Sequence, residues 1–119
     1  PLGGVRNVLQ LTQDLRARHM DVTVASALDT AVGMNMGLAA VAALPVLSDD
    51  EDLDVPPAPA GLATGSLFIE DVTEPRKIVD GFIDSAPVTP DPARLSDLAA
   101  PGDRKDWWFN RVRQCAQFL

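Results

Sequence analysis

The N-terminal part of the chain alternates apolar and polar positions with the period of an α-helix. Apolar or half-apolar side chains recur three or four residues apart, at Val5, Val8, Leu9, Thr12 and Leu15. Charged and amide side chains fill the positions between them. This spacing predicts one amphipathic helix over Val5 to Arg18, preceded by Gly3 and Gly4.

The pattern then changes to a period of two. Val22 and Val24 alternate with smaller or more polar residues up to Ser26. β-branched residues in such an alternation are typical of a half-buried strand. We therefore expect a short strand over residues 21–26.

A nearly unbroken apolar run follows this strand. Between residues 31 and 44 the one strongly polar residue is Asn35. We expect a buried helix here, capped by Asp29 or Thr30 and stopped by Pro45.

A membrane span is the alternative interpretation of the same run. The run is shorter than the ~20 residues that a bilayer requires, and alanine and glycine dominate it. Gly33 and Gly37 would let the helix approach a sheet closely, as layered packing requires. The order helix, strand, helix therefore favours parallel βα units, and thus an α/β protein.

The middle of the chain is acidic and rich in proline. Residues 48–60 combine five carboxylates with three prolines, so we expect an exposed loop. The loop lacks the central glycine and the distal glutamate of a helix-loop-helix calcium site. A Gly-rich bend over 61–65 then leads into an apolar run at 67–69.

The last part of the chain predicts three further elements. Asp80-Gly81 between two β-prone segments indicates a hairpin. A short helix should begin at the prolines near residue 92, and a terminal helix should be capped near Asp103 or Asp106. We expect Trp107 and its neighbour Trp108 to pack against another domain rather than to stack on a ligand.

Composition limits the class of protein. The chain has 119 residues, of which 46% are hydrophobic and 23% charged, which is typical of a soluble globular domain. A formal net charge of -7 without a basic cluster argues against a nucleic-acid partner. The single cysteine, Cys115, predicts a packed thiol and a cytoplasmic location. Pro1 stands where a native chain has Met, so we expect a fragment of a longer protein.

No complete catalytic constellation is visible from residue chemistry. The one histidine, His19, lies at a predicted helix exit, where an exposed C-terminal cap explains it. We find no phosphate-binding glycine loop, no nucleophile with an orienting base and no His/Cys metal cluster.

A resemblance goes further. The phrases "PLGGV", "VASALDTAVGMNMGLAAVAALP" and "AGLATGSLFIEDV", followed by "PVTPDPARL" and a "WW...R...C" ending, closely resemble the C-terminal part of the actinobacterial-type o-succinylbenzoate synthase family of the enolase superfamily. The resemblance covers nearly the whole chain. It implies a modified (β/α)8 barrel whose active site lies at the C-terminal ends of the strands, where helix N-termini suit an anion.

The resemblance also implies a division of the chain. Residues 1–66 would be the last βα units of the barrel, with the sixth helix, the seventh strand, the seventh helix and the eighth strand in that order. Residues 67–119 would return to the capping domain. The partner would be the missing N-terminal part of the same protein.

The activity implied is a lyase reaction of menaquinone biosynthesis. A cyclohexadiene dicarboxylate would lose water to give 2-succinylbenzoate, with Mg²⁺ holding the enediolate. The metal ligands and the catalytic lysines would precede Pro1, so we expect no catalytic and no metal-binding residue in this chain. The alternatives are N-succinylamino acid racemase or another enolase-superfamily activity, or a non-catalytic interaction fragment.

Four residues are the expected substrate-binding positions. By the resemblance, the hydroxyl of Ser26 and the backbone amide of Gly61 bind the succinyl carboxylate, while Gly3 and Gly4 permit close backbone approach. Ordinary structural roles explain each of these residues as well, and helix capping explains Asp29 better than acid-base chemistry does.

Overall fold

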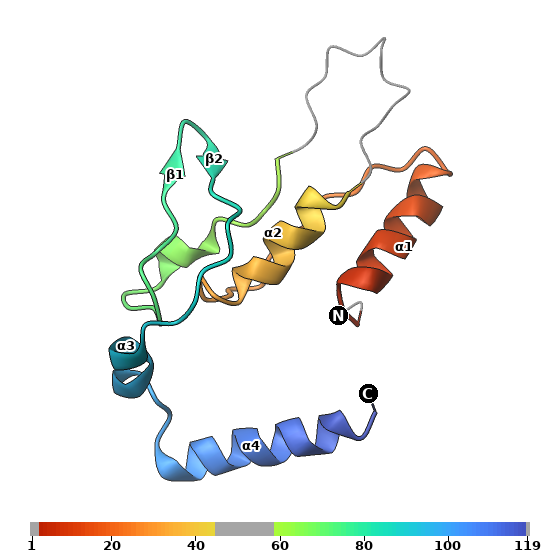
Figure 1. Cartoon of the computed structure of the whole chain (residues 1–119). Helices are drawn as coiled ribbons and strands as arrows, with labels where there is room; N and C mark the ends of the chain where they lie inside the picture. Colours follow the sequence, from red (N-terminus) through yellow and green to blue (C-terminus); the bar gives the residue numbers. More distant parts are fainter. Residues whose placement is uncertain (1–2, 45–58, 119) are drawn as a thin grey trace.

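The computed structural model describes residues 3–44 and 59–118 (Figure 1). In chain order its elements are α1 (Val5–Arg16), α2 (Met34–Ala42), the 3₁₀ helix η1 (Thr64–Leu67), β1 (Ile78–Val79), β2 (Phe82–Ile83), α3 (Pro92–Asp97) and α4 (Gly102–Ala116). Of the predicted acidic loop over 48–60, only residues 59 and 60 lie in the described part.

The amphipathic N-terminal helix is confirmed as α1 and ends two residues earlier than expected. Its inward position Thr12 is fully buried, because its hydroxyl donates to the Val8 carbonyl oxygen at 2.8 Å and leaves no polar group unsatisfied. His19 is exposed just beyond the helix with a φ of +58°, and its N–H donates to the Arg16 carbonyl oxygen. The expected role of His19 at a helix exit is confirmed.

The apolar helix begins later than predicted. The α-helix α2 starts at Met34, after a turn over residues 31–33. Thr30 caps this turn, since its Oγ1 accepts from the Gly33 N–H at 3.0 Å. The alternative cap was wrong: the Asp29 carboxylate accepts from the Ala27 N–H, which lies before the helix.

The core lies where α2 packs on the chain around Leu62. Met34, Leu38 and Leu62 form the buried cluster, and Val24 and Ile83 pack at its edge. Gly37 permits this approach, because a Cβ there would lie 3.0 Å from the Leu62 side chain. Figure 1 shows α1 beside α2 and running in the same direction, as successive helices of βα units do.

The predicted strand over 21–26 is reduced to one parallel bridge. Ala25 pairs with Gly61, residues 21–24 form no regular strand, and the Val24 carbonyl oxygen accepts from the Gly61 N–H. An interior strand of a parallel sheet bonds to neighbours on both sides, and the described residues supply one short neighbour. The bridge nevertheless establishes the parallel relation that the sequence predicted.

The hairpin is confirmed. β1 pairs with β2 in an antiparallel register, with Val79 opposite Phe82. Asp80 and Gly81 occupy the turn with φ values of +50° and +83°, which fits a type I′ hairpin turn.

The two C-terminal helices differ in how they begin. Asp91 caps α3, because its Oδ1 accepts from the N–H groups of Ala93 and Arg94. The terminal helix α4 begins at Gly102 with no capping side chain, so the predicted caps Asp103 and Asp106 were wrong. Both carboxylates lie inside the helix.

Helix α4 packs against no other helix or strand of the described residues. Trp107 and Trp108 are half-exposed and meet edge to face, with ring centroids 4.8 Å apart. Cys115 is exposed, which corrects the prediction of a packed thiol. The helix has nothing here to pack on, so its apolar side chains face solvent.

The whole chain is more open than a compact domain. Its radius of gyration is 17.3 Å, against roughly 13–14 Å for a compact domain of this length. The structure is of the α/β kind, with a parallel contact but no barrel within the described residues. None of the described helices is long and apolar enough to cross a bilayer.

Candidate functional site

The candidate site lies where the parallel bridge ends. The Ser26 N–H donates to the Gly61 carbonyl oxygen at 3.0 Å, which holds the two chain segments together. The Ser26 hydroxyl lies 3.3 Å from that same oxygen and 2.9 Å from the Thr64 hydroxyl. Two residues predicted to share a site, Ser26 and Gly61, are therefore adjacent although 35 positions separate them.

The hydroxyls of Ser26 and Thr64 are placed where they can bind an anion. Ser26 and Thr64 are each half-buried, and either hydroxyl can donate to the other. When Thr64 donates to Ser26, the Ser26 hydroxyl donates to the Gly61 carbonyl oxygen, and a ligand oxygen can take the place of that acceptor. The arrangement suits a carboxylate, which only accepts hydrogen bonds.

Gly61 lets the two chain segments approach closely, and its amide is already used in a backbone hydrogen bond. Its N–H donates to the Val24 carbonyl oxygen at 2.9 Å, so the bridge already uses the amide that the resemblance assigned to the substrate. A Cβ on Gly61 would lie 2.9 Å from the Ala25 Cβ. Only glycine lets the two strand ends come this close.

Gly3 and Gly4 lie at the start of α1, at the same end of the helix pair as the start of α2 (Figure 1). Their φ values of +78° and +112° require glycine. Among the described residues, no hydrogen bond joins either glycine to Ser26 or Gly61. A turn into the helix accounts for them, and a contact with substrate stays a prediction.

The segment after Ser26, residues 27–31, forms what we call the corner loop. Leu28 adopts a φ of +69° and is half-exposed. Such a backbone conformation is unfavourable for a bulky residue and persists only when its surroundings impose it. The conformation of the corner loop therefore depends on contacts with other parts of the chain.

Sequence reasoning missed two residues of this region. Thr64 belongs to a quoted phrase of the resemblance, but its contact with Ser26 depends on how the 61–65 bend folds. Asp71 is buried, and its Oδ2 accepts from the Ala31 N–H at 2.7 Å. No local pattern marks Asp71, because its partner lies 40 residues earlier.

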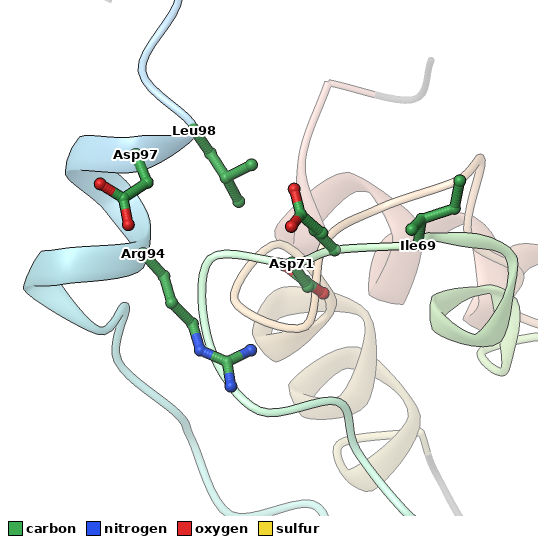
Figure 2. A pocket seen from close by; sticks show the side chains of 6 residues that line it. Ile69, Asp71, Arg94, Asp97 and Leu98 are labelled. Atoms are coloured by element: carbon green, nitrogen blue, oxygen red, sulfur yellow. The ribbon is translucent and has the colours of Figure 1, made fainter.

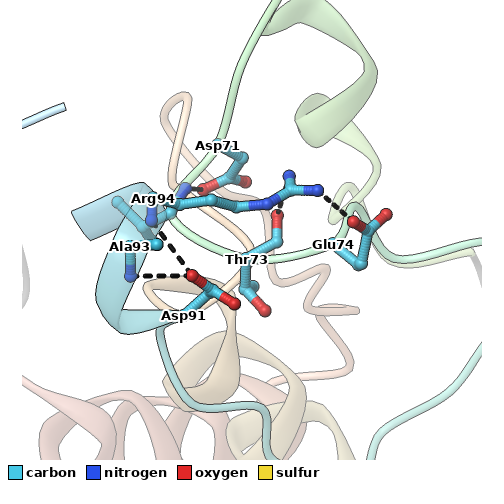
Figure 3. A network of polar contacts seen from close by, with 7 residues as sticks. Asp71, Thr73, Glu74, Asp91, Ala93 and Arg94 are labelled. Carbon is cyan, nitrogen blue, oxygen red and sulfur yellow. Dashed lines mark hydrogen bonds and ion pairs between the residues drawn. The ribbon is translucent and has the colours of Figure 1, made fainter. Parts of the chain in front are cut away.

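The larger of two neighbouring hollows has a volume of about 280 Å³ and contains neither Ser26 nor Gly61. Figure 2 shows Asp97 and Leu98 across this hollow from Ile69, with Asp71 between. Arg94 of its lining forms an ion pair with Glu74 and donates to the Thr73 carbonyl oxygen (Figure 3). The hollow therefore lies where α3 is bonded to the segment that contains Thr73 and Glu74.

The described residues do not fit a metal site. Within residues 3–44 and 59–118, no three His, Cys, Asp or Glu side chains gather closely enough to hold an ion. The buried carboxylate of Asp71 instead accepts two backbone N–H groups, from Ala31 and Val72. No chemical step is therefore assigned to a metal on these side chains.

Comparisons with known proteins give a consistent result. The chain is 48% identical over 120 residues to the o-succinylbenzoate synthase of Mycobacterium tuberculosis (strain ATCC 25618 / H37Rv), covering all of this chain and 33% of the relative. The synthases of Mycobacterium leprae (strain TN) and Mycolicibacterium smegmatis (strain ATCC 700084 / mc(2)155) are each 45% identical, over 100% and 97% of this chain and 32% of each relative. No protein-family model matches the chain.

The suspected resemblance is thereby confirmed. The chain is homologous along its whole length to part of these synthases, and it spans about a third of the length of the curated relatives it matches. The relatives all bear the synthase name, which does not favour the racemase alternative.

Proposed function

We infer that the chain belongs to the o-succinylbenzoate synthase family and forms part of such an enzyme. The observation that carries this inference is the 45–48% identity to named synthases over essentially all of the chain. The activity we propose for the whole protein is a dehydration, a carbon-oxygen lyase reaction that converts a cyclohexadiene dicarboxylate into 2-succinylbenzoate in menaquinone biosynthesis. The single unpaired thiol supports a reducing, cytoplasmic location.

The proposed fold is the enolase-superfamily barrel. We assign α1 to its sixth helix, residues 22–26 to its seventh strand, α2 to its seventh helix and the chain at Gly61 to its eighth strand. The parallel Ala25–Gly61 bridge and the common direction of α1 and α2 support this assignment. The remaining two thirds of a synthase would supply the other strands.

The returning segment, residues 67–118, would lie on the barrel and its capping domain. The exposed tryptophans of α4 support this placement, because an aromatic face of this size is normally covered. The N-terminal part of the same protein is the partner that we propose for it.

The chain's own residues would bind one end of the substrate. The Ser26 hydroxyl would donate to the succinyl carboxylate, and the Thr64 hydroxyl would orient it. Gly61 would keep the two strand ends close enough for both hydroxyls to reach one cavity. In this family Mg²⁺ supplies charge stabilisation for the enediolate, and we expect its ligands outside the described residues.

The test is a kinetic one on the full-length protein. Ser26→Ala should raise KM roughly 10- to 150-fold and change kcat less than about threefold, because a lost hydrogen bond to a charged group is worth ~1.5–3 kcal/mol and the succinyl end is remote from the reacting carbon. Thr64→Val should raise KM by less, and the double variant should show less than the product of the two effects.

Ser66→Ala is the matched control, since the hydroxyl of this exposed serine of η1 donates to the Ala63 carbonyl oxygen and forms no hydrogen bond with Ser26 or Thr64. It should leave both constants unchanged. An unaltered KM in Ser26→Ala would remove the hydroxyl pair from the pocket. Absence of synthase activity in the wild-type protein would refute the proposed reaction itself.

A further inference from the structure

The backbone of Ala31 is held on both of its polar groups by the returning segment. Its N–H donates to Asp71 Oδ2 at 2.7 Å, and its carbonyl oxygen accepts from Arg76 Nε at 3.2 Å. Ala31 and Asp71 are 2% and 4% exposed, so water does not compete with the Asp71 contact. Two side chains five positions apart thus hold one residue that lies 40 and 45 positions earlier in the chain.

Both gripping side chains are themselves fixed. The second Asp71 oxygen, Oδ1, accepts from the Val72 N–H at 2.6 Å. Arg76 Nη1 donates to the carbonyl oxygens of Asp84 and Ala86 at 2.7 and 2.9 Å. Such networks are rigid, and loss of the Asp71 carboxylate would leave the buried Ala31 N–H unpaired.

The same network reaches α2 through its one strongly polar residue. Arg76 Nη2 donates to Asn35 Oδ1, which also accepts from the Val88 N–H at 3.1 Å. Asn35 Nδ2 donates in turn to the Val88 carbonyl oxygen at 2.8 Å. The returning segment is therefore hydrogen-bonded both to Ala31 and to α2.

Ala31 is the last residue of the corner loop, and Ser26 immediately precedes that loop. Within the loop the Ala27 N–H donates to the Asp29 carboxylate at 3.4 Å, Leu28 is left-handed, and the hydroxyl and carbonyl oxygens of Thr30 accept from the turn that follows. Hydrogen bonds from distant segments of the chain reach the loop region at its two ends, at the bridge of Ser26 and at Ala31.

We propose that Asp71 and Arg76 are positioning residues that orient the Ser26 hydroxyl by clamping the backbone of Ala31. They touch no substrate themselves. The inference rests on the proposed function, because Asp71 and Arg76 would support the part of the chain that is proposed to bind substrate. It also makes the returning segment necessary for the site and not only for stability.

The experiment uses the full-length protein. Asp71→Asn leaves one acceptor oxygen for two N–H groups, and Arg76→Lys replaces a fork of donors by one ammonium. Each should raise KM about 3- to 10-fold with kcat changed less than about twofold, as for a displaced binding group. In a Ser26→Ala background neither should raise KM further.

Arg94→Met is the matched control. Arg94 also belongs to the returning segment and also donates to a backbone carbonyl, that of Thr73, but it does not touch the corner loop. This variant should lower thermal stability without changing KM. An equal rise in KM for Arg94→Met, or unchanged KM in both clamp variants, would overturn the proposal.

Hydrogen–deuterium exchange separates the clamp from the proposed reaction. Amides of the corner loop should exchange faster in Asp71→Asn than in wild type or Arg94→Met, whether or not the wild type proves to be a synthase. Unchanged exchange would reject the clamp. If Asp71→Asn does not fold, the milder variant Arg76→Lys tests the clamp through its KM and its hydrogen–deuterium exchange.

Discussion

The closest backbone approach near the site depends on one missing side chain. At Gly61 a Cβ would meet the Ala25 Cβ at 2.9 Å and the Ala25 Cα at 3.4 Å, and backbone atoms cannot rotate away. The contact also sets where the Ser26 hydroxyl lies, because its own N–H pairs with Gly61. Packing and binding are therefore coupled at this position.

Gly61→Ala should consequently harm both stability and binding. We expect ~1–3 kcal/mol of destabilisation from forcing the strand ends apart, together with a higher KM in the full-length protein. Gly65→Ala is the control, since its added Cβ meets nothing within 4 Å. Thermal unfolding and steady-state kinetics measure the two effects, and equal behaviour of both variants would contradict the steric argument.

At the scale of elements, α3 shows how a six-residue helix is fixed. The Asp91 carboxylate accepts from two N–H groups of the first turn, at 2.8 and 3.0 Å, and Pro92 sets the first helical φ (Figure 3). A helix this short is not stable on its own, so its cap and its Arg94 contacts determine whether it forms.

Asp91→Ala should therefore lower the stability of the full-length protein by ~1 kcal/mol. The reduced Tm should be visible in thermal unfolding, with kinetic constants of the enzyme retained. Ser96→Ala, on the same helix but outside the cap, should be close to neutral. A wild-type Tm for Asp91→Ala would mean that tertiary contacts alone hold α3.

How well each element could be predicted depends on how far along the chain its determining residues lie. The positions of α1, α3 and the hairpin depend on neighbours within a few residues, such as Asp80-Gly81, and sequence patterns predicted them. The strand over 21–26 depends on partner strands, so only its bridge formed. The late start of α2 escaped prediction for the same reason, because Asp71 binds Ala31 from 40 positions away.

The same reasoning applies to the candidate site. The pairing of Ser26 with Gly61 was predictable from the resemblance, since the ends of adjacent parallel strands meet at one edge. The engaged amide of Gly61 and the Thr64 contact were not, because they depend on atomic positions within the bend over 61–65. The resemblance predicted which two segments meet, the structure shows the contacts that each residue makes, and their roles in binding stay predictions.

At the scale of the whole molecule, large apolar side chains remain exposed on several elements. The set includes Leu67, Ile69, Ile78, Val79, Phe82, Trp107, Trp108, Phe109, Val112 and Phe118. Hydrophobic burial is the main force that opposes chain entropy. Because this much apolar area stays unburied, we expect the isolated chain to have too little stabilisation to fold alone.

The isolated 119-residue chain should accordingly not unfold cooperatively as a monomer. We expect a shallow circular-dichroism melt, and self-association by light scattering, because the apolar surface seeks cover. Co-expression with the remaining part of a full-length synthase should restore a sharp transition. A sharp melt of the monomer alone would contradict this expectation.

The parallel bridge has a kinetic consequence. Ser26 and Gly61 meet only after the 34 residues between them have looped back, so the entropy of closing that loop must be offset by contacts of α2 before the two strand ends can pair. We expect this edge to assemble late in folding. An early, partly ordered intermediate would thus possess helices yet be unable to recognise an acid group.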